Sequence, residues 1–151
     1  MEETNEEKIG NQGADTSMAT YNNILVFGKN SNFQLGLGHS DPVGSIQQLA
    51  FDLPSGQRIT KIFCGYDHAF ALSSGDEIWG FGKNGKGQLG LGTSEDAPAP
   101  RRVRLLCGQR VCAMAAGADH SVALTAAGDV YSCGGNAAGQ LGLGHTTPRG
   151  Q

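Results

Sequence analysis

The sequence is poor in the residues that build several protein classes. Four cysteines in 151 residues are too few for a disulfide-rich secreted miniprotein. Five prolines, with no three-residue glycine period, exclude collagen. Apolar runs such as residues 24–27 fall far short of the roughly 20 residues that cross a bilayer, so we expect no membrane span. Because the N-terminus also lacks the basic and apolar regions of a signal peptide, we expect an intracellular protein of the cytoplasm or nucleus.

Most of the chain has little excess charge of either sign. Residues 1–20 carry five acids and one base, whereas residues 21–151 carry nine acids and ten bases. A nearly neutral body lacks the clustered basic surface that captures nucleic acid, so no nucleic-acid partner is expected. The acidic leader, residues 1–20, has almost no large apolar residues and is predicted to be a disordered, solubilising tail.

Glycine, by contrast, is abundant, and the sequence contains internal repeats. An eleven-residue segment at 28–38 recurs at 82–92 and at 134–144, with seven identical positions in all three copies. The repeated glycines, asparagines and glutamines are Gly28, Asn30, Gln34, Gly36 and Gly38; Gly82, Asn84, Gln88, Gly90 and Gly92; Gly134, Asn136, Gln140, Gly142 and Gly144. The glycines at the end of each copy are predicted to supply turns with positive φ, and Leu35 and Leu37 are predicted to point inward, as are their counterparts.

A second motif lies between these copies. Residues 64–72 recur at 116–124, and both copies contain a glycine three residues before a histidine, Gly65 with His68 and Gly117 with His120. The brief β-branched and aromatic runs predict strands near 24–28, 46–53, 58–64, 68–74, 77–82, 102–106, 110–116, 120–125 and 129–134. Four strands in a unit of about 50 residues are typical of a propeller blade.

The two motifs together resemble the regulator of chromosome condensation repeat family over about residues 24–147. That resemblance implies an all-β partial β-propeller of four-stranded antiparallel blades, with repeats near 24–76 and 77–128 and an incomplete one at 129–151. The family closes a ring from seven repeats, and this chain holds about two and a half. We therefore expect a fragment of a longer propeller, a truncated or alternatively spliced product, or a chain completed by self-association through open sheet edges.

The resemblance also implies what the chain does. In the family's nucleotide-exchange members, an Asp directly before the motif histidine faces the GTPase, and this position matches Asp67 and Asp119. The same carboxylates could instead cap backbone amides in their turns. The motif histidines are expected to hydrogen-bond the backbone of a neighbouring blade. The leading hypothesis is a protein-binding regulator that exchanges nucleotide on a small Ras-like GTPase, and the alternative is a passive interaction scaffold.

Several other patterns are expected to be incidental. Residues 80–85 fit a dinucleotide-binding glycine pattern, but no helix N-terminus follows to hold phosphate. Asp119, His120 and Ser121 spell a hydrolase triad, yet neighbours on a strand point to opposite faces. The four histidines and four cysteines show no converging ligand spacing. We therefore expect no cofactor, no metal and no conventional enzyme, and the single Trp79 argues against the family's light-sensing form.

The arginines at 101, 102 and 104 form the chain's basic cluster. Arg102 and Arg104 are predicted to share the solvated face of an outer strand, with Val103 and Leu105 on the other face. The competing interpretation is a contact with phosphate or an acidic partner, which two or three cations would support weakly.

Overall fold

The computed structural model describes residues 23–147, and the regular elements in that range are β-strands. The predicted disordered leader, residues 1–20, lies outside the described residues. Within the described range, no helix has the length and apolar character needed to span a bilayer.

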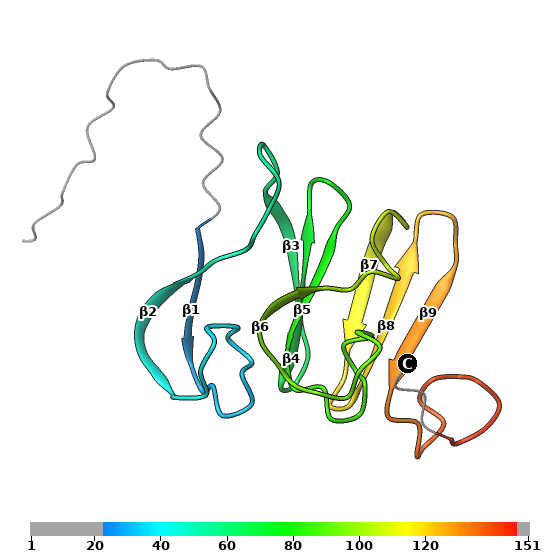
Figure 1. Cartoon of the computed structure of the whole chain (residues 1–151). Helices are drawn as coiled ribbons and strands as arrows, with labels where there is room; N and C mark the ends of the chain where they lie inside the picture. Colours follow the sequence, from blue (N-terminus) through cyan, green and yellow to red (C-terminus); the bar gives the residue numbers. More distant parts are fainter. Residues whose placement is uncertain (1–22, 148–151) are drawn as a thin grey trace, which may run out of the picture.

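The strands form three antiparallel sheets, which we call blades 1, 2 and 3. Blade 1 pairs β1 (Ile24–Gly28) with β2 (Val43–Leu49); blade 2 contains β3 (Ile59–Cys64), β4 (His68–Ser73), β5 (Ile78–Gly82) and β6 (Ala97–Arg102); blade 3 contains β7 (Val111–Ala116), β8 (His120–Thr125) and β9 (Val130–Gly134). The three sheets stand side by side in chain order (Figure 1). The predicted all-β fold with a four-stranded antiparallel blade is confirmed.

The blades do not coincide with the sequence repeats. The expected repeat at 24–76 supplies β1 and β2 to blade 1, and β3 and β4 to blade 2. Blade 2 is therefore completed by β5 and β6 from the following repeat. Each repeat thus ties two neighbouring blades together through the chain itself.

Two of the predicted strands are misplaced. The strand expected at 46–53 lies at Val43–Leu49, because Phe51 leaves the sheet to pack edge-on against Trp79 and Phe81. The strand expected at 102–106 is wrong: β6 ends at Arg102, and residues 104–108 form turns. Arg102 and Arg104 therefore do not share a strand face. An outer strand tolerates the prolines of residues 97–102, since their missing N–H groups need no partner at a sheet edge.

The core lies between the blades. Strands β4 and β5 are buried along their whole length, because blades 1 and 3 cover the two faces of blade 2. On one face, Ala69 and Phe81 pack against Leu49 of blade 1, and on the other, Phe70 packs near Ala123 of blade 3. Stability in this chain therefore depends on contacts between blades.

Each copy of the glycine-rich segment folds into a loop at one end of a blade. The glycines at 36, 38, 90, 92, 142 and 144 all have positive φ, as predicted. The first leucine is buried at Leu89 and Leu141, but the second is only half-buried at Leu91 and is 41% exposed at Leu143. The prediction that both leucines point inward holds in the second copy, because the half-buried Leu91 packs against the core between blades 2 and 3, but not for the exposed Leu143. Leu35 and Leu37 of the first copy are both half-buried.

A buried asparagine fixes each of these loops. Asn30, Asn84 and Asn136 are fully buried, and the side-chain oxygen of each accepts a hydrogen bond from the backbone N–H five residues later. The side-chain nitrogen of each donates to a backbone carbonyl nine residues later. One side chain thus holds both halves of a loop, which keeps the neighbouring turns in place.

Candidate functional site

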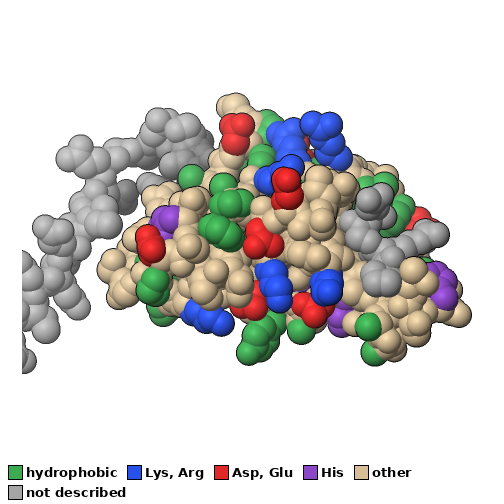
Figure 2. Space-filling view, turned by 60° about the horizontal axis from the view of Figure 1, so that its bottom comes forward, with side chains coloured by type: hydrophobic (Ala, Val, Ile, Leu, Met, Phe, Trp, Pro, Cys, Tyr) green, Lys and Arg blue, Asp and Glu red, His purple; other side chains and the backbone are tan. Residues whose placement is uncertain are grey.

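The two motif aspartates lie at the loop end of the blades. His68 pairs with Gly82 across β4 and β5, and His120 pairs with Gly134 across β8 and β9, so the turn before each histidine meets the loop after each glycine. These turns and loops gather at the same end of all three sheets (Figure 1). Figure 2 brings this end forward and shows basic and acidic side chains next to one another near its middle.

Asp67 is buried in the contact between blades 1 and 2. It is 7% exposed, and its Oδ1 accepts a hydrogen bond from Gln34 Nε2 at 3.2 Å. The Lys29 ammonium lies 3.9 Å from the same oxygen. In addition, the backbone carbonyl of Asp67 accepts a hydrogen bond from the N–H of Lys83. The carboxylate therefore joins the loop of one blade to the turn of the next.

Asp119 occupies the equivalent position one blade further on but is more open. Its Oδ1 lies 3.6 Å from Lys83 Nζ, and 42% of its side chain is exposed. Gln88, the counterpart of Gln34, has a buried side-chain nitrogen that makes no hydrogen bond to the described residues. Asp119 therefore keeps more of its carboxylate available to solvent than Asp67 does.

An exposed tyrosine lies on the turn that bonds to the Asp119 turn. Tyr66 is 77% exposed, and its N–H donates a hydrogen bond to the backbone oxygen of Gly117, two residues before Asp119. Lys83 connects both turns, through its backbone to Asp67 and through its ammonium to Asp119. We call Tyr66, Lys83 and Asp119 the loop-end surface.

His68 bonds to the neighbouring blade, but to a side chain rather than the predicted backbone. Its Nε2 lies 2.7 Å from Ser121 Oγ, and both residues are buried. Burial lowers the pKa of His68 from 6.5 to about 4, and the nearby Asp119 carboxylate opposes that shift only in part. The ring is therefore neutral near pH 7 and serves as a hydrogen-bonding group between blades.

The triad-like residues are separated, as predicted. Ser121 is 2% exposed and bonds to His68 of blade 2 rather than to the adjacent His120. His68 Nδ1 has no hydrogen-bond partner among the described residues, so no carboxylate orients the ring for proton transfer. Within residues 23–147, no three His, Cys, Asp or Glu side chains gather as metal ligands would.

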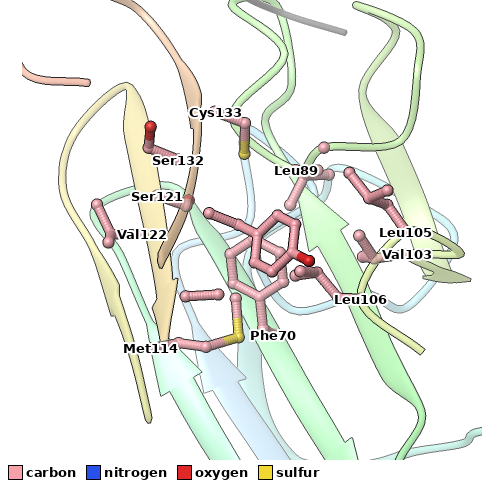
Figure 3. A pocket seen from close by; sticks show the side chains of 13 residues that line it. Phe70, Leu89, Val103, Leu105, Leu106, Met114, Ser121, Val122, Ser132 and Cys133 are labelled. Atoms are coloured by element: carbon pink, nitrogen blue, oxygen red, sulfur yellow. The ribbon is translucent and has the colours of Figure 1, made fainter. Parts of the chain in front are cut away.

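A small apolar cavity lies between blades 2 and 3. It measures about 70 Å³, and Figure 3 shows Phe70, Val103 and Leu106 of blade 2 on one side with Met114 of blade 3 on the other. Cys133 borders it, and burial raises the pKa of this thiol to about 11. The thiol is therefore protonated at neutral pH and is a poor nucleophile.

A second hollow lies along β6 and the turn that follows it. Glu77, Arg101, Arg102, Arg104 and Leu105 line it, together with residues 90–92 and Cys107, and we call it the arginine groove. The Arg102 guanidinium lies 3.1 Å from Glu77 and stacks 5.0 Å from the ring centroid of Trp79. The predicted basic cluster thus contains one arginine that is held in place.

Sequence reasoning missed the partners of the aspartates. Lys29 and Lys83 occupy the same position in the first two copies of the glycine-rich segment, whereas Gly135 stands there in the third. That position is the available signal, because a lysine precedes the motif aspartate at a similar distance within each of the two repeats, and the ion pair that this recurrence suggests joins neighbouring blades. Ser121 carried no such signal, since the equivalent residue in the other copy is Ala69.

Comparison with known proteins agrees with this geometry. The family model of the regulator of chromosome condensation (RCC1) repeat matches residues 22–72 and 76–124, and a second model of the same repeat matches 59–88 and 111–140. The chain belongs to the RCC1 repeat family. The three sheets formed by the described residues are therefore blades of an RCC1-type β-propeller.

Relatives with known names differ widely in what they do. The chain is 39% identical to the ultraviolet-B receptor UVR8 of Arabidopsis thaliana over 75% of this chain and 26% of that protein. It is 36% identical to the human probable E3 ubiquitin-protein ligase HERC3, over 83% of this chain and 12% of the ligase. The chain thus spans about a quarter or less of these relatives.

Solved structures show the same fold. Human WBSCR16 superposes with a TM-score of 0.70 at 32% identity, over 83% of this chain and 33% of that one. Yeast RCC1 (Prp20), in its complex with Kap60, superposes with a TM-score of 0.74 at 24% identity, over 85% of this chain and 32% of that one. This chain corresponds to about a third of either structure.

Proposed function

We propose that the loop-end surface binds a protein partner, and that the chain serves as part of a regulatory propeller. The observation that carries this proposal is the exposure of Tyr66 and of the Asp119 side chain on neighbouring turns. Tyrosine is one of the residue types enriched at binding hot spots, and charged groups around it can set specificity for a partner of complementary charge. The buried loop asparagines and the His68 bond to Ser121 hold both turns still, so little ordering is needed on binding.

The specific activity that we propose is nucleotide exchange on a small Ras-like GTPase. Exchange requires a surface that stabilises the nucleotide-free GTPase and needs no nucleophile or general base. A carboxylate such as Asp119 can compete for the region of the GTPase that holds phosphate and magnesium. A solved relative, Prp20p of Saccharomyces cerevisiae, is described with binding properties to Gsp1p and histones, which supports a protein partner for this fold.

A scaffold without exchange activity is the second candidate. The observation that favours it is the burial of Asp67, whose carboxylate is already bonded to Gln34 and lies near Lys29. Of the two motif aspartates, only Asp119 then has a carboxylate open enough to reach a partner. A single carboxylate can support binding without displacing a nucleotide.

One experiment separates these functions. The full chain is mixed with a recombinant small Ras-like GTPase loaded with fluorescent GDP, and both binding and GDP release are measured. We expect release to be accelerated, with a loss of tenfold or so for Asp119→Ala or Tyr66→Ala, in the range of about 1.4 kcal/mol per tenfold. Asp129→Ala removes an exposed carboxylate near the hairpin between β8 and β9 and serves as the matched control.

The outcomes are distinct. Binding without faster release supports the scaffold, provided that Asp119→Ala and Tyr66→Ala weaken it while Asp129→Ala does not. Binding that none of these substitutions changes, or no binding at all, contradicts a role for the loop-end surface.

A further inference from the structure

We propose that the arginine groove is a docking site for the chain's own acidic leader, residues 1–20. The proposal is independent of the loop-end surface, because it concerns a different part of blade 2. It starts from a surplus of positive charge in the groove and a surplus of negative charge in a segment of the same chain.

The arginines that line the groove outnumber the carboxylates that line it. Arg102 is paired with Glu77, whereas Arg101 and Arg104 are exposed and make no ion pair with any described residue. Both of these residues line the same hollow. Two unpaired arginines on one concave surface form a site for carboxylates, because each guanidinium can bind a carboxylate through two parallel N–H donors.

Arg102 gives the groove a fixed wall. Its guanidinium is held from one side by the Glu77 carboxylate and from the other by the face of Trp79. Leu105, which is 64% exposed, lines the same groove. The surface therefore offers cations together with an apolar contact, which suits an extended peptide better than an isolated anion.

The leader has the matching chemistry. It contains Glu2, Glu3, Glu6, Glu7 and Asp15 against a single lysine, and Ile9 and Met18 supply apolar side chains. Twenty residues of extended chain span up to about 70 Å, whereas a domain of 125 residues has a radius of gyration of only about 14 Å. The leader therefore reaches the groove from β1, and covalent attachment gives it an effective concentration in the millimolar range.

The experiment uses the full chain and leaves the folded part intact. A variant with Glu2, Glu3, Glu6 and Glu7 replaced by Gln is compared with the unaltered chain by ¹H–¹⁵N spectroscopy, including the arginine side-chain signals. We expect shifts at Arg101, Arg104 and Leu105, and loss of these differences when salt is raised from about 0.01 M to about 1 M, since the Debye length falls from about 30 Å to about 3 Å.

Two arginine variants complete the test. Arg101→Ala with Arg104→Ala is expected to make the spectrum insensitive to leader charge, whereas Arg58→Ala, which removes an exposed arginine from the start of the blade, is expected to leave the sensitivity unchanged. Both arginines of the double variant are exposed, and retained signals of β4 and β5 confirm folding.

Three outcomes overturn the proposal. They are no shifts on neutralising the leader, shifts confined to Lys29 and Lys83 at the loop end, and shifts that persist in the double arginine variant. In the first of these cases, groove signals that respond to an added single-stranded oligonucleotide would assign the arginines to a nucleic acid instead.

Discussion

At the residue scale, two glycines of blade 2 adopt the same left-handed backbone conformation in different surroundings. Gly82 has a φ of +101°, and a Cβ placed there would lie 2.5 Å from the backbone oxygen of Asp67. Gly92 has a φ of +75° with open space around it. A side chain at Gly92 would therefore cause backbone strain alone, whereas a side chain at Gly82 would cause backbone strain and steric overlap together.

We expect Gly82→Ala to lower the free energy of unfolding by about 3 kcal/mol or more, since the left-handed conformation costs about 1–2 kcal/mol and the backbone overlap adds to it. For Gly92→Ala, strain alone predicts a loss of about 1 kcal/mol. Urea unfolding of both variants measures the difference. Equal losses at the two positions would contradict the close approach of Gly82 to the turn of Asp67.

The buried histidine makes stability depend on pH. Because burial lowers the pKa of His68 to about 4, the unfolded chain binds a proton at this ring at a higher pH than the folded chain does. The neutral ring therefore contributes to the free energy of unfolding, and this contribution is complete above pH 6.5. It is lost as the pH falls toward 4, by roughly 3 kcal/mol in total. Urea unfolding across this range checks the slope. His68→Gln should flatten it, while His145→Gln, at an exposed position, should not.

At the element scale, the two aspartate turns should differ in the strength of their ties between blades. The hydrogen bond from Gln34 to Asp67 joins a half-buried side chain to a buried one, whereas Lys83 and Asp119 are both substantially exposed. We expect a coupling energy of about 1–2 kcal/mol for the first pair, because a bond to a charged group is retained away from water. For the second pair we expect about 0.5 kcal/mol or less, because solvent screens it.

Double-mutant cycles measure both couplings. Gln34→Ala and Asp67→Asn form one cycle, and Lys83→Met and Asp119→Asn form the other. Raising the salt concentration should reduce the second coupling and leave the first nearly unchanged. A larger coupling for Lys83 with Asp119 would show that this pair is the stronger tie between blades.

Most strands could be predicted from local pattern, and the exceptions have local causes. The runs at 24–28 and 120–125 match the observed strands because their β-branched and apolar residues are bounded by glycine or a turn. Val103 and Leu106 misled the prediction, since they are buried by a turn that crosses the blade rather than by a strand. The strand β6 was not predicted because it contains prolines, which a strand accepts only at the edge of a sheet.

At the scale of the whole molecule, the sequence predicts the repeat but not the pairing of side chains between repeats. The two turns before His68 and His120 could be placed from the motifs alone. The bond from His68 to Ser121 spans 53 residues and depends on how two blades face each other. The stacking of Arg102 on Trp79 likewise depends on the register of β5 with β6. The first contact follows from blade packing and the second from strand register within blade 2, and no local pattern encodes either.

The outer faces of blades 1 and 3 should promote self-association. On blade 1, Leu25 is 56% and Phe27 is 67% exposed, whereas the equivalent residues of blade 2, Trp79 and Phe81, are buried against Phe51. On blade 3, Val130 is 65% exposed, whereas its equivalent in blade 2, Ile78, is fully buried. Blade 1 of one molecule can therefore pack against blade 3 of another as neighbouring blades pack within the chain. Such a contact is head-to-tail rather than two-fold symmetric.

Light scattering after size-exclusion chromatography tests this packing. We expect the full chain to show an average mass that rises with concentration, because burying one such face removes several large apolar side chains from water. Phe27→Ser and Val130→Ser should each lower that mass at a given concentration, since each removes one side of the same head-to-tail contact. Leu105→Ser, an equally exposed apolar residue away from both faces, should leave it unchanged. A mass independent of concentration, or an equal effect of Leu105→Ser, would show that these faces do not meet in solution.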